Sequence, residues 1–292
     1  MNAPLVTIVI PVRNRPALAC AAARSVIAQT CPDWELIVAD DGSDDGTAEA
    51  LEQIGEPRLR VLRCGRLGNV ARLRNLGVRS GAGDYVAFLD SDDLWLPDKL
   101  ARQLAAVRAG GAGWCYGGFG HIDADGAPIA RRAGRFAAEN GWILEALLLE
   151  RTAAYVGTLL VERGLFDRVG GFDESLTARA DVDLAFRLAA AAEAVAVPTP
   201  LMLVREHPAR ITAGFADPHE LTVIVWEKFL AREGGAAFRS IARRRLARLL
   251  AGAAKRRLRA RQPLRALSLL ARAARHRLRS ACAAAGDGTD AA

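Results

Sequence analysis

The chain has 292 residues, of which 51% are hydrophobic and 25% charged, so it can bury one large core or two small ones. It has no run of about 18 uncharged apolar residues, so no membrane-spanning helix is predicted. Its net charge of +7 comes from the C-terminal tail, because residues 1–234 carry 25 basic and 31 acidic side chains whereas residues 235–292 carry 15 and 2.

The N-terminal segment and the cysteines bear on the compartment. No basic residue precedes the first apolar segment, 5–11, so we expect no signal peptide. The five cysteines are odd in number and lack the spacing of a metal site, as expected of small core residues in a reducing environment. Both features favour a cytoplasmic protein.

The first part of the chain alternates between two hydrophobic periods, which predict buried strands and amphipathic helices. The expected strands and the helices between them are residues 6–11, 35–40, 59–63 and 85–90, and residues 17–29, 47–54 and 71–79. This alternation predicts an α/β fold with a doubly wound parallel sheet. Polar residues follow three strands, at 12–14, 40–46 and 90–93, and should meet at one edge of the sheet.

The second part is less regular. Residues 114–130 predict a strand, a turn and a returning segment at 128–130. The further helices and the further strand are expected at 139–149, 181–192 and 218–232, and at 194–197. Beyond Gly234-Gly235, two helices are separated by Gln262-Pro263, and the final residues 283–292 are expected to be disordered. Leucines form one face of each helix: Leu246, Leu249 and Leu250 on the first, and Leu264, Leu267, Leu270 and Leu278 on the second.

Three carboxylates stand where the fourth predicted strand ends. Asp90, Asp92 and Asp93 follow an apolar run, and such a cluster repels itself unless a cation or a proton compensates its charge. A solvated turn ahead of a helix starting near Pro97 would also explain them. We expect Asp93 to face that helix.

Six short motifs occur in a particular order along the chain. They are Thr7-Ile8-Val9-Ile10-Pro11-Val12-Arg13-Asn14, Asp40-Asp41-Gly42-Ser43, Arg72-Leu73-Arg74-Asn75, Asp90-Ser91-Asp92-Asp93, Gly170-Gly171-Phe172-Asp173-Glu174 and Asp181-Val182-Asp183-Leu184. In this order and at these separations, the chain resembles the family 2 glycosyltransferases over roughly residues 5–210. The resemblance implies an inverting enzyme with the GT-A fold that depends on a nucleotide-diphosphate sugar.

The resemblance also implies a domain plan and an activity. A Rossmann-like GT-A domain at 1–234 would comprise a nucleotide-binding half at 1–110 and an acceptor half at 111–234, followed by a basic helical tail at 235–282. The enzyme would move a sugar from a nucleotide-diphosphate donor, UDP by preference, to an acceptor hydroxyl in cell-surface polysaccharide or glycan assembly. The Gln-x-x-Arg-Trp motif of processive synthases is absent from the sequence, so we expect the addition of one or a few sugars.

The site residues follow from the same resemblance. The nucleotide-sugar site would comprise Pro11, Val12, Arg13, Asp41, Arg74, Asp90 and Ser91, with Asp41 accepting from the uracil imide. A divalent cation, Mn²⁺ or Mg²⁺, would be held by Asp92, with Asp90 supporting it or holding the ribose and with His207 nearby. Such a cation stabilises a departing diphosphate and accepts one or two carboxylates plus substrate phosphates.

Asp181 matches the family's general base, which deprotonates the acceptor hydroxyl. It could instead only cap the following helix. The family's acidic residue before the base is Ala180 here, which leaves the identity of the acceptor open. Arg74 could be a structural arginine on an amphipathic helix, and His207 an ordinary surface histidine.

Two other functions are compatible with parts of this pattern. A non-catalytic nucleotide-sugar-binding or scaffold protein is favoured only by Ala180. A nucleotidyltransferase needs a glycine-rich phosphate loop after the first strand, and residues 12–16 do not form one.

The basic tail is expected to bind an anionic partner or to pack on residues 1–234. Residues 239–279 could dock on an anionic membrane surface, bind nucleic acid, or pack with only a solvated basic face. Arginines and leucines without stacking aromatic residues favour lipid, so no nucleic-acid partner is expected. The predicted partners are a nucleotide sugar, a glycan or lipid-linked acceptor and, through the tail, the inner face of the membrane.

Overall fold

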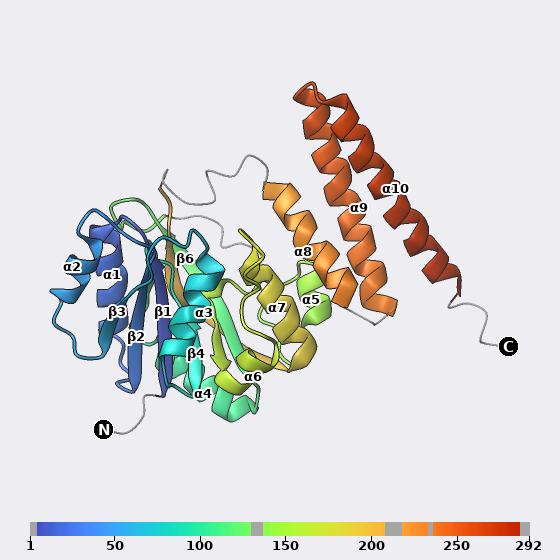
Figure 1. The fold of residues 1–292 in the computed structure, drawn as a ribbon. Coiled ribbons are helices and arrows are strands. Elements are labelled where there is room, and N and C mark those ends of the chain that lie inside the picture. The colour runs from blue at the N-terminus through green and yellow to red at the C-terminus, as the bar shows by residue number, and fades with distance from the viewer. Residues whose placement is uncertain (1–4, 130–136, 208–217, 233–235, 287–292) are drawn as a thin grey trace. The chain divides into compact units, whose positions relative to one another are not determined.

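The computed structural model describes residues 5–129, 137–207, 218–232 and 236–286 of the chain. Two compact units are formed, residues 1–207 and residues 208–292. The first unit is built on an eight-stranded sheet in the order β3-β2-β1-β4-β7-β6-β8-β5 (Figure 1). Its strands are β1 (Val6–Val12), β2 (Trp34–Asp40), β3 (Leu59–Arg63), β4 (Tyr85–Phe88), β5 (Leu94–Trp95), β6 (Trp114–Ile122), β7 (Leu160–Glu162) and β8 (Ala194–Arg205).

The parallel half of the sheet confirms the predicted alternation. Strands β1 to β4 are parallel, and β7 then joins β4 antiparallel. The helices of this unit are α1 (Pro16–Ile27), α2 (Thr47–Glu52), α3 (Val70–Ser80), α4 (Lys99–Gly110), α5 (Leu144–Leu148), α6 (Arg163–Arg168) and α7 (Ala180–Ala191), with a 3-10 turn, η1, at Val156–Thr158. The fold is therefore mixed α/β with crossover helices.

Side chains of β1 point alternately to the two faces of the sheet. Ile8 and Ile10 belong to a core shared with α1 and α4. On the other face α3 lies so close that a Cβ on Gly77 would be 2.4 Å from Val9 Cγ1. Helices α1 and α3 thus cover opposite faces of this strand (Figure 1).

The structure corrects two expected elements in the second part. The helix expected at 139–149 is shorter, because Gly141 has a φ of +83° and forms an antiparallel bridge with Ala194, so only Leu144–Leu148 is helical. The strand expected at 194–197 continues to Arg205. Its pairing with β6 shifts register where Gly118 meets Pro200, a bulge of the kind that admits proline into a strand.

The second unit is helical and comprises α8 (Pro218–Arg232), α9 (Ala236–Arg259) and α10 (Pro263–Gly286). Helix α8 packs with α9, so the division between the units falls before α8, whereas the sequence placed it at Gly234-Gly235, outside the described residues. Helix α10 runs to Gly286, so the disorder expected from 283 onward is wrong for 283–286, and residues 287–292 lie outside the description. Among the described helices, none has the length and apolar character needed to cross a membrane.

Candidate active site

The polar segments after β1, β2 and β4 meet at the carboxyl edge of the sheet, as the sequence predicts. Val12 and Asp40 are paired at the ends of β1 and β2. Just beyond them, Asn14 Nδ2 donates to Asp44 Oδ1 over 2.7 Å, and the Asn14 amide donates to Ser43 Oγ over 3.0 Å. The loops after β1 and β2 are therefore joined beside the end of β4.

Asp92 is the centre of the site. Its Oδ2 lies 3.0 Å from Arg15 Nη1 and 3.0 Å from His207 Nε2, and its side chain is only 14% exposed. These partners come from the start of α1 and from the segment after β8. The structure thus brings together Asp92 and His207, which the sequence assigns to one metal site.

Asp90 forms an ion pair with a different arginine. Arg74 of α3 forms an ion pair with it, and the Arg74 guanidinium lies 5.2 Å from the centre of the Phe172 ring. Desolvation raises the pKa of Asp90, the charge of Arg74 opposes that rise, and the negative charges of Asp92 and Asp181 add to it. Arg74 therefore faces the site, and Asp181 is close enough to act electrostatically on the carboxylate cluster.

Asp181 lies in the first turn of α7 and does not cap it. The helix begins at Ala180, and its N-cap residue is Arg179, which has a φ of +61° and makes no side-chain cap hydrogen bond. Asp181 is half-buried, whereas Asp183 is buried and pairs with Arg187 over 2.7 Å. Of the two interpretations of Asp181, the capping one lacks its hydrogen bond.

The Gly-Gly-Phe-Asp-Glu segment is held from both sides, by α3 and by α7. Asn75 of α3 donates to the Phe172 carbonyl and accepts from the Phe172 amide, each over 2.9 Å. Arg187 of α7 donates to the carbonyls of Val169 and Gly171, each over 2.6 Å. The segment consequently links α3 to α7, the helix that carries Asp181.

The predicted nucleotide-binding residues lie along the same edge. Pro11 and Val12 are buried in β1, Ser91 is buried, and Arg13 is exposed. Asp41 is buried, and its carboxylate accepts the amides of Leu67 and Gly68 over 2.6 and 2.9 Å and pairs with Arg66. In this structure Asp41 thus anchors the loop that precedes α3.

Two arginines at the site were missed by the sequence analysis. Arg15 contacts Asp92, and Arg205 donates from Nε to the Asp92 carbonyl over 3.0 Å. The Arg205 amide donates to Asp93 Oδ1 over 2.9 Å, so Asp93 contacts β8, a contact that the sequence did not predict. No local motif marks these contacts, because each joins segments far apart in the sequence.

The donor set suits a hard divalent cation completed by substrate. Mg²⁺ and Mn²⁺ accept carboxylates together with waters and substrate phosphates, and Mn²⁺, a transition metal, also accepts imidazole. Asp92 and His207 supply one donor of each type within 3.0 Å of each other. Within the described ranges, no group of three or more His, Cys, Asp or Glu side chains could hold a metal by itself. The residues present therefore fit a cation that is bound together with a diphosphate.

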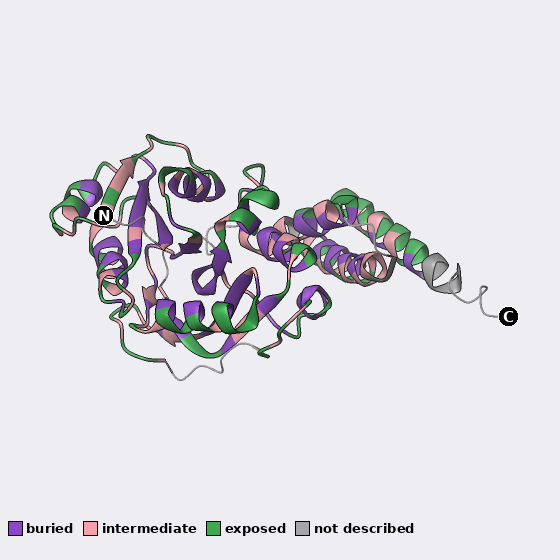
Figure 2. Cartoon of the chain, turned by 90° about the horizontal axis from the view of Figure 1, so that it is seen from below, coloured by how far each residue is buried: buried purple, intermediate pink, exposed green. Residues whose placement is uncertain are grey.

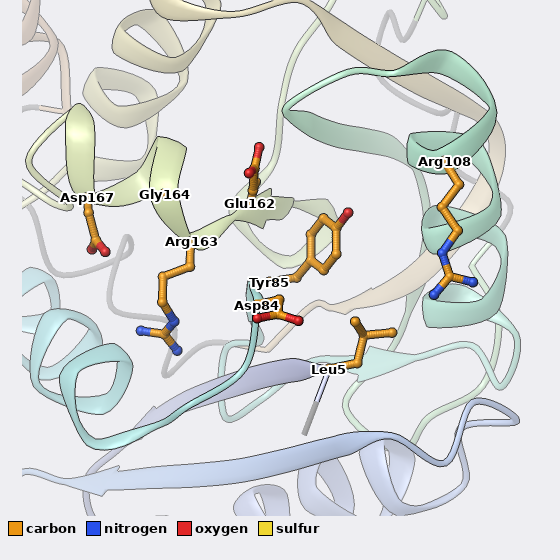
Figure 3. A pocket seen from close by; sticks show the side chains of 8 residues that line it. All are labelled: Leu5, Asp84, Tyr85, Arg108, Glu162, Arg163, Gly164 and Asp167. Carbon is orange, nitrogen blue, oxygen red and sulfur yellow. The ribbon is translucent and has the colours of Figure 1, made fainter. Parts of the chain in front are cut away.

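A separate pocket lies at the opposite edge of the sheet (Figure 3). Leu5 and Tyr85, at the amino ends of β1 and β4, line it with Arg163 and Asp167. Arg163 is engaged there, donating to the Val78 carbonyl over 3.0 Å and to Thr7 Oγ1 over 2.9 Å. This pocket belongs to the scaffold and not to the carboxylate site.

The order of motifs and the geometry of the sheet edge agree with one family. The sequence profile described as "Glycosyl transferase family 2" matches residues 7–160, more than half of the chain. The chain belongs to glycosyl transferase family 2. The resemblance inferred from the motifs is thereby confirmed.

Several curated glycosyltransferases are similar to this family 2 chain. The putative teichuronic acid biosynthesis glycosyltransferase TuaG of Bacillus subtilis is 35% identical over 128 residues, which cover 43% of this chain and 51% of the relative. The UDP-Glc:alpha-D-GlcNAc-diphosphoundecaprenol beta-1,3-glucosyltransferase WfgD of Escherichia coli is 33% identical over 119 residues, covering 41% and 47%. The chain thus spans about half the length of these two relatives.

Solved structures establish the fold. Residues 1–349 of Staphylococcus aureus TarS, in complex with UDP-GlcNAc, superpose with a TM-score of 0.66 at 17% identity, covering 84% of this chain and 71% of that fragment. The mannosyltransferase PcManGT of Pyrobaculum calidifontis, in complex with GDP-Man and Mn²⁺, gives a TM-score of 0.54 at 21% identity, covering 98% and 79%. The expected GT-A fold is confirmed.

Proposed function

We propose that this family 2 chain transfers a sugar from a nucleotide-diphosphate donor to an acceptor hydroxyl, with inversion at the anomeric carbon. The observation that carries the proposal is the grouping of Asp90, Asp92 and His207 at the carboxyl edge of the sheet, with Asp181 in electrostatic reach. Open α/β sheets bind ligands at that edge. A carboxylate that is held apart from the metal ligands is what an inverting transfer requires as its base.

Each site residue has a part in this mechanism. Asp92 and His207 would hold Mn²⁺ or Mg²⁺, which when bound neutralises the charge of the departing diphosphate. Asp181 would take the proton of the acceptor hydroxyl, on the side of the sugar away from the diphosphate. Arg74 compensates the charge of Asp90, and Asn75 and Arg187 position α7 and its base.

The names of the similar proteins suggest the substrates. WfgD is named for UDP-Glc and a diphosphoundecaprenol-linked acceptor, TuaG for teichuronic acid biosynthesis, and TarS is described with UDP-GlcNAc. We therefore propose UDP as the nucleotide and a lipid-linked glycan of cell-surface polysaccharide assembly as the acceptor. Such an acceptor lies at a membrane, so the enzyme would work from the cytoplasm on the inner face.

A screen of nucleotide sugars, with and without Mn²⁺, tests this function with the full chain. We expect hydrolysis of at least one UDP-sugar to UDP and free sugar, and we expect EDTA to stop it. Tight binding of a donor, with neither hydrolysis of that donor nor transfer to any acceptor, would favour the binding or scaffold alternative. Release of pyrophosphate from a nucleoside triphosphate and a sugar 1-phosphate, without hydrolysis of any UDP-sugar, would favour a nucleotidyltransferase.

A further inference from the structure

The leucines of α9 and α10 have opposite surroundings. Leu246 and Leu250 of α9 are fully buried, since α9 packs against both α8 and α10. Helix α10 turns small residues toward α9, and the buried ones recur every seven positions: Ala266, Ala273 and Ser280. Helix α9 therefore packs through its leucines within its own unit, whereas the leucines of α10 do not.

The leucines of α10 point away from the other helices of their unit. Leu264, Leu267 and Leu278 are 81%, 61% and 68% exposed. Their spacing of three and eleven residues places them on one helical face, with Leu270 at its border. We call Leu264, Leu267, Leu270 and Leu278 the leucine face, and Figure 2 shows the exposed residues along this C-terminal helix. Large apolar side chains that form a continuous exposed face mark a binding surface.

The charge around the leucine face has one sign. Residues 239–279 contain fifteen basic and no acidic side chains. Arg275 and Arg277 flank the leucine face on its two sides, and both are exposed. An apolar face bordered by arginines suits an anionic surface into which leucines can insert.

The same charges disfavour a second copy of this chain as the occupant. A pair of α10 helices joined at their leucine faces would bring Arg275 and Arg277 to the positions that flank a coiled-coil seam. Stable pairs place opposite charges at those positions, whereas here both are basic. Nucleic acid is disfavoured as well, since α10 offers no Phe, Tyr or Trp side chain for stacking.

We propose that the leucine face of α10 docks the enzyme on an anionic phospholipid bilayer. Leu264, Leu267 and Leu278 enter the interface while Arg275 and Arg277 contact lipid phosphates. Each basic residue near an anionic leaflet adds to the attraction, and the attraction weakens with salt. The inference goes beyond the proposed sugar transfer, because lipid binding can be measured without a donor or an acceptor.

Flotation of the full chain with liposomes tests the proposal. Wild-type protein should float with vesicles of phosphatidylglycerol and phosphatidylcholine, and flotation should fall at least about fivefold in Leu267→Ser/Leu278→Ser and in Arg275→Gln/Arg277→Gln. The matched control is Leu149→Ser/Leu258→Ser, which alters leucines that are 46% and 51% exposed off the leucine face and should float like wild type. The emission of a Leu278→Trp variant, after subtraction of the wild-type emission from the five native tryptophans, should shift to the blue on these vesicles, which reports insertion at position 278.

Three results would overturn the proposal. Equal flotation of the wild type with pure phosphatidylcholine vesicles would contradict a role for the basic side chains in binding. If Leu267→Ser/Leu278→Ser floats like wild type and Leu278→Trp shows no blue shift, the leucine face is not the surface that contacts lipid. A dimer in light scattering that dissociates in Leu267→Ser/Leu278→Ser would identify a second copy as the occupant. Loss of sugar transfer alone would concern the proposed function and not the docking.

Discussion

At the scale of single residues, Asp92 connects several residues of the proposed site. Arg15 and His207 share its Oδ2, and Arg205 holds its carbonyl. We expect Asp92→Ala to weaken Mn²⁺-dependent UDP binding by about tenfold or more, the usual cost of disturbing a metal site. Calorimetry measures it, with Asp125→Ala, at an exposed turn carboxylate, as the control. Unchanged affinity in Asp92→Ala would place the cation elsewhere.

Lys99, which lies outside the proposed site, makes folding stability depend on pH. It is fully buried in α4, its ammonium lies 3.9 Å from the centre of the Trp95 ring, and desolvation lowers its pKa to about 7. Between pH 7 and about 10 the unfolded chain binds this proton and the folded chain does not, so folding stability rises with pH across that window. Below pH 7 the cost of burial is fully present.

We therefore expect Lys99→Met to flatten this dependence. Relative to the variant, the wild-type free energy of unfolding should gain roughly 1.4 kcal/mol per pH unit between pH 7 and 10. Urea denaturation at several pH values measures both proteins. Parallel pH profiles would mean that Lys99 stays protonated in the folded state.

At the scale of elements, the Gly170-Gly171 turn contacts both α3 and α7. Both glycines have positive φ, +81° and +63°, but a Cβ on Gly171 would also lie 2.8 Å from Asn75 Oδ1, whereas a Cβ on Gly170 meets no atom within 4 Å. Gly170→Ala should cost only backbone strain, roughly 1–2 kcal/mol. Gly171→Ala should cost about 1–3 kcal/mol more, from overpacking.

The two glycine variants also test the positioning of Asp181. Because Gly171 lies against Asn75 and its carbonyl is held by Arg187, the shift in Gly171→Ala should lower the rate of transfer more than Gly170→Ala does. Urea denaturation and the rate of sugar transfer are measured for both variants. Equal effects of the two substitutions on both readouts would contradict this role for the turn.

The same scale shows what the sequence could and could not predict. Strands β1 to β4 and helices α1 and α3 have clear periods, and the structure has all of them. Strands β5 and β7 have two and three residues, too few for any period, and prolines obscure β8. The contacts of Arg15 and Arg205 with residues 92–93 depend on strand order, which no local pattern encodes.

At the scale of the whole molecule, the first unit carries the complete proposed site and the second carries the leucine face. Every residue assigned to donor, cation or base lies between Pro11 and His207, within the first unit. Substitutions in α10 should therefore leave hydrolysis of a soluble nucleotide sugar unchanged while reducing transfer to an acceptor embedded in a bilayer. The rates of Leu267→Ser/Leu278→Ser in both assays test whether the two units have these separate roles. An equal loss with both would contradict it.

The rate of sugar transfer by Asp181→Asn, measured beside its affinity for UDP, tests the central claim most directly. Asparagine keeps the shape of the side chain but cannot accept the proton of the acceptor hydroxyl. We predict that transfer falls by about a hundredfold or more while UDP binding stays near that of the wild type. Asp125→Asn, at the exposed turn, should change neither value. Transfer by Asp181→Asn at the wild-type rate would contradict the assignment and show that another group is the base.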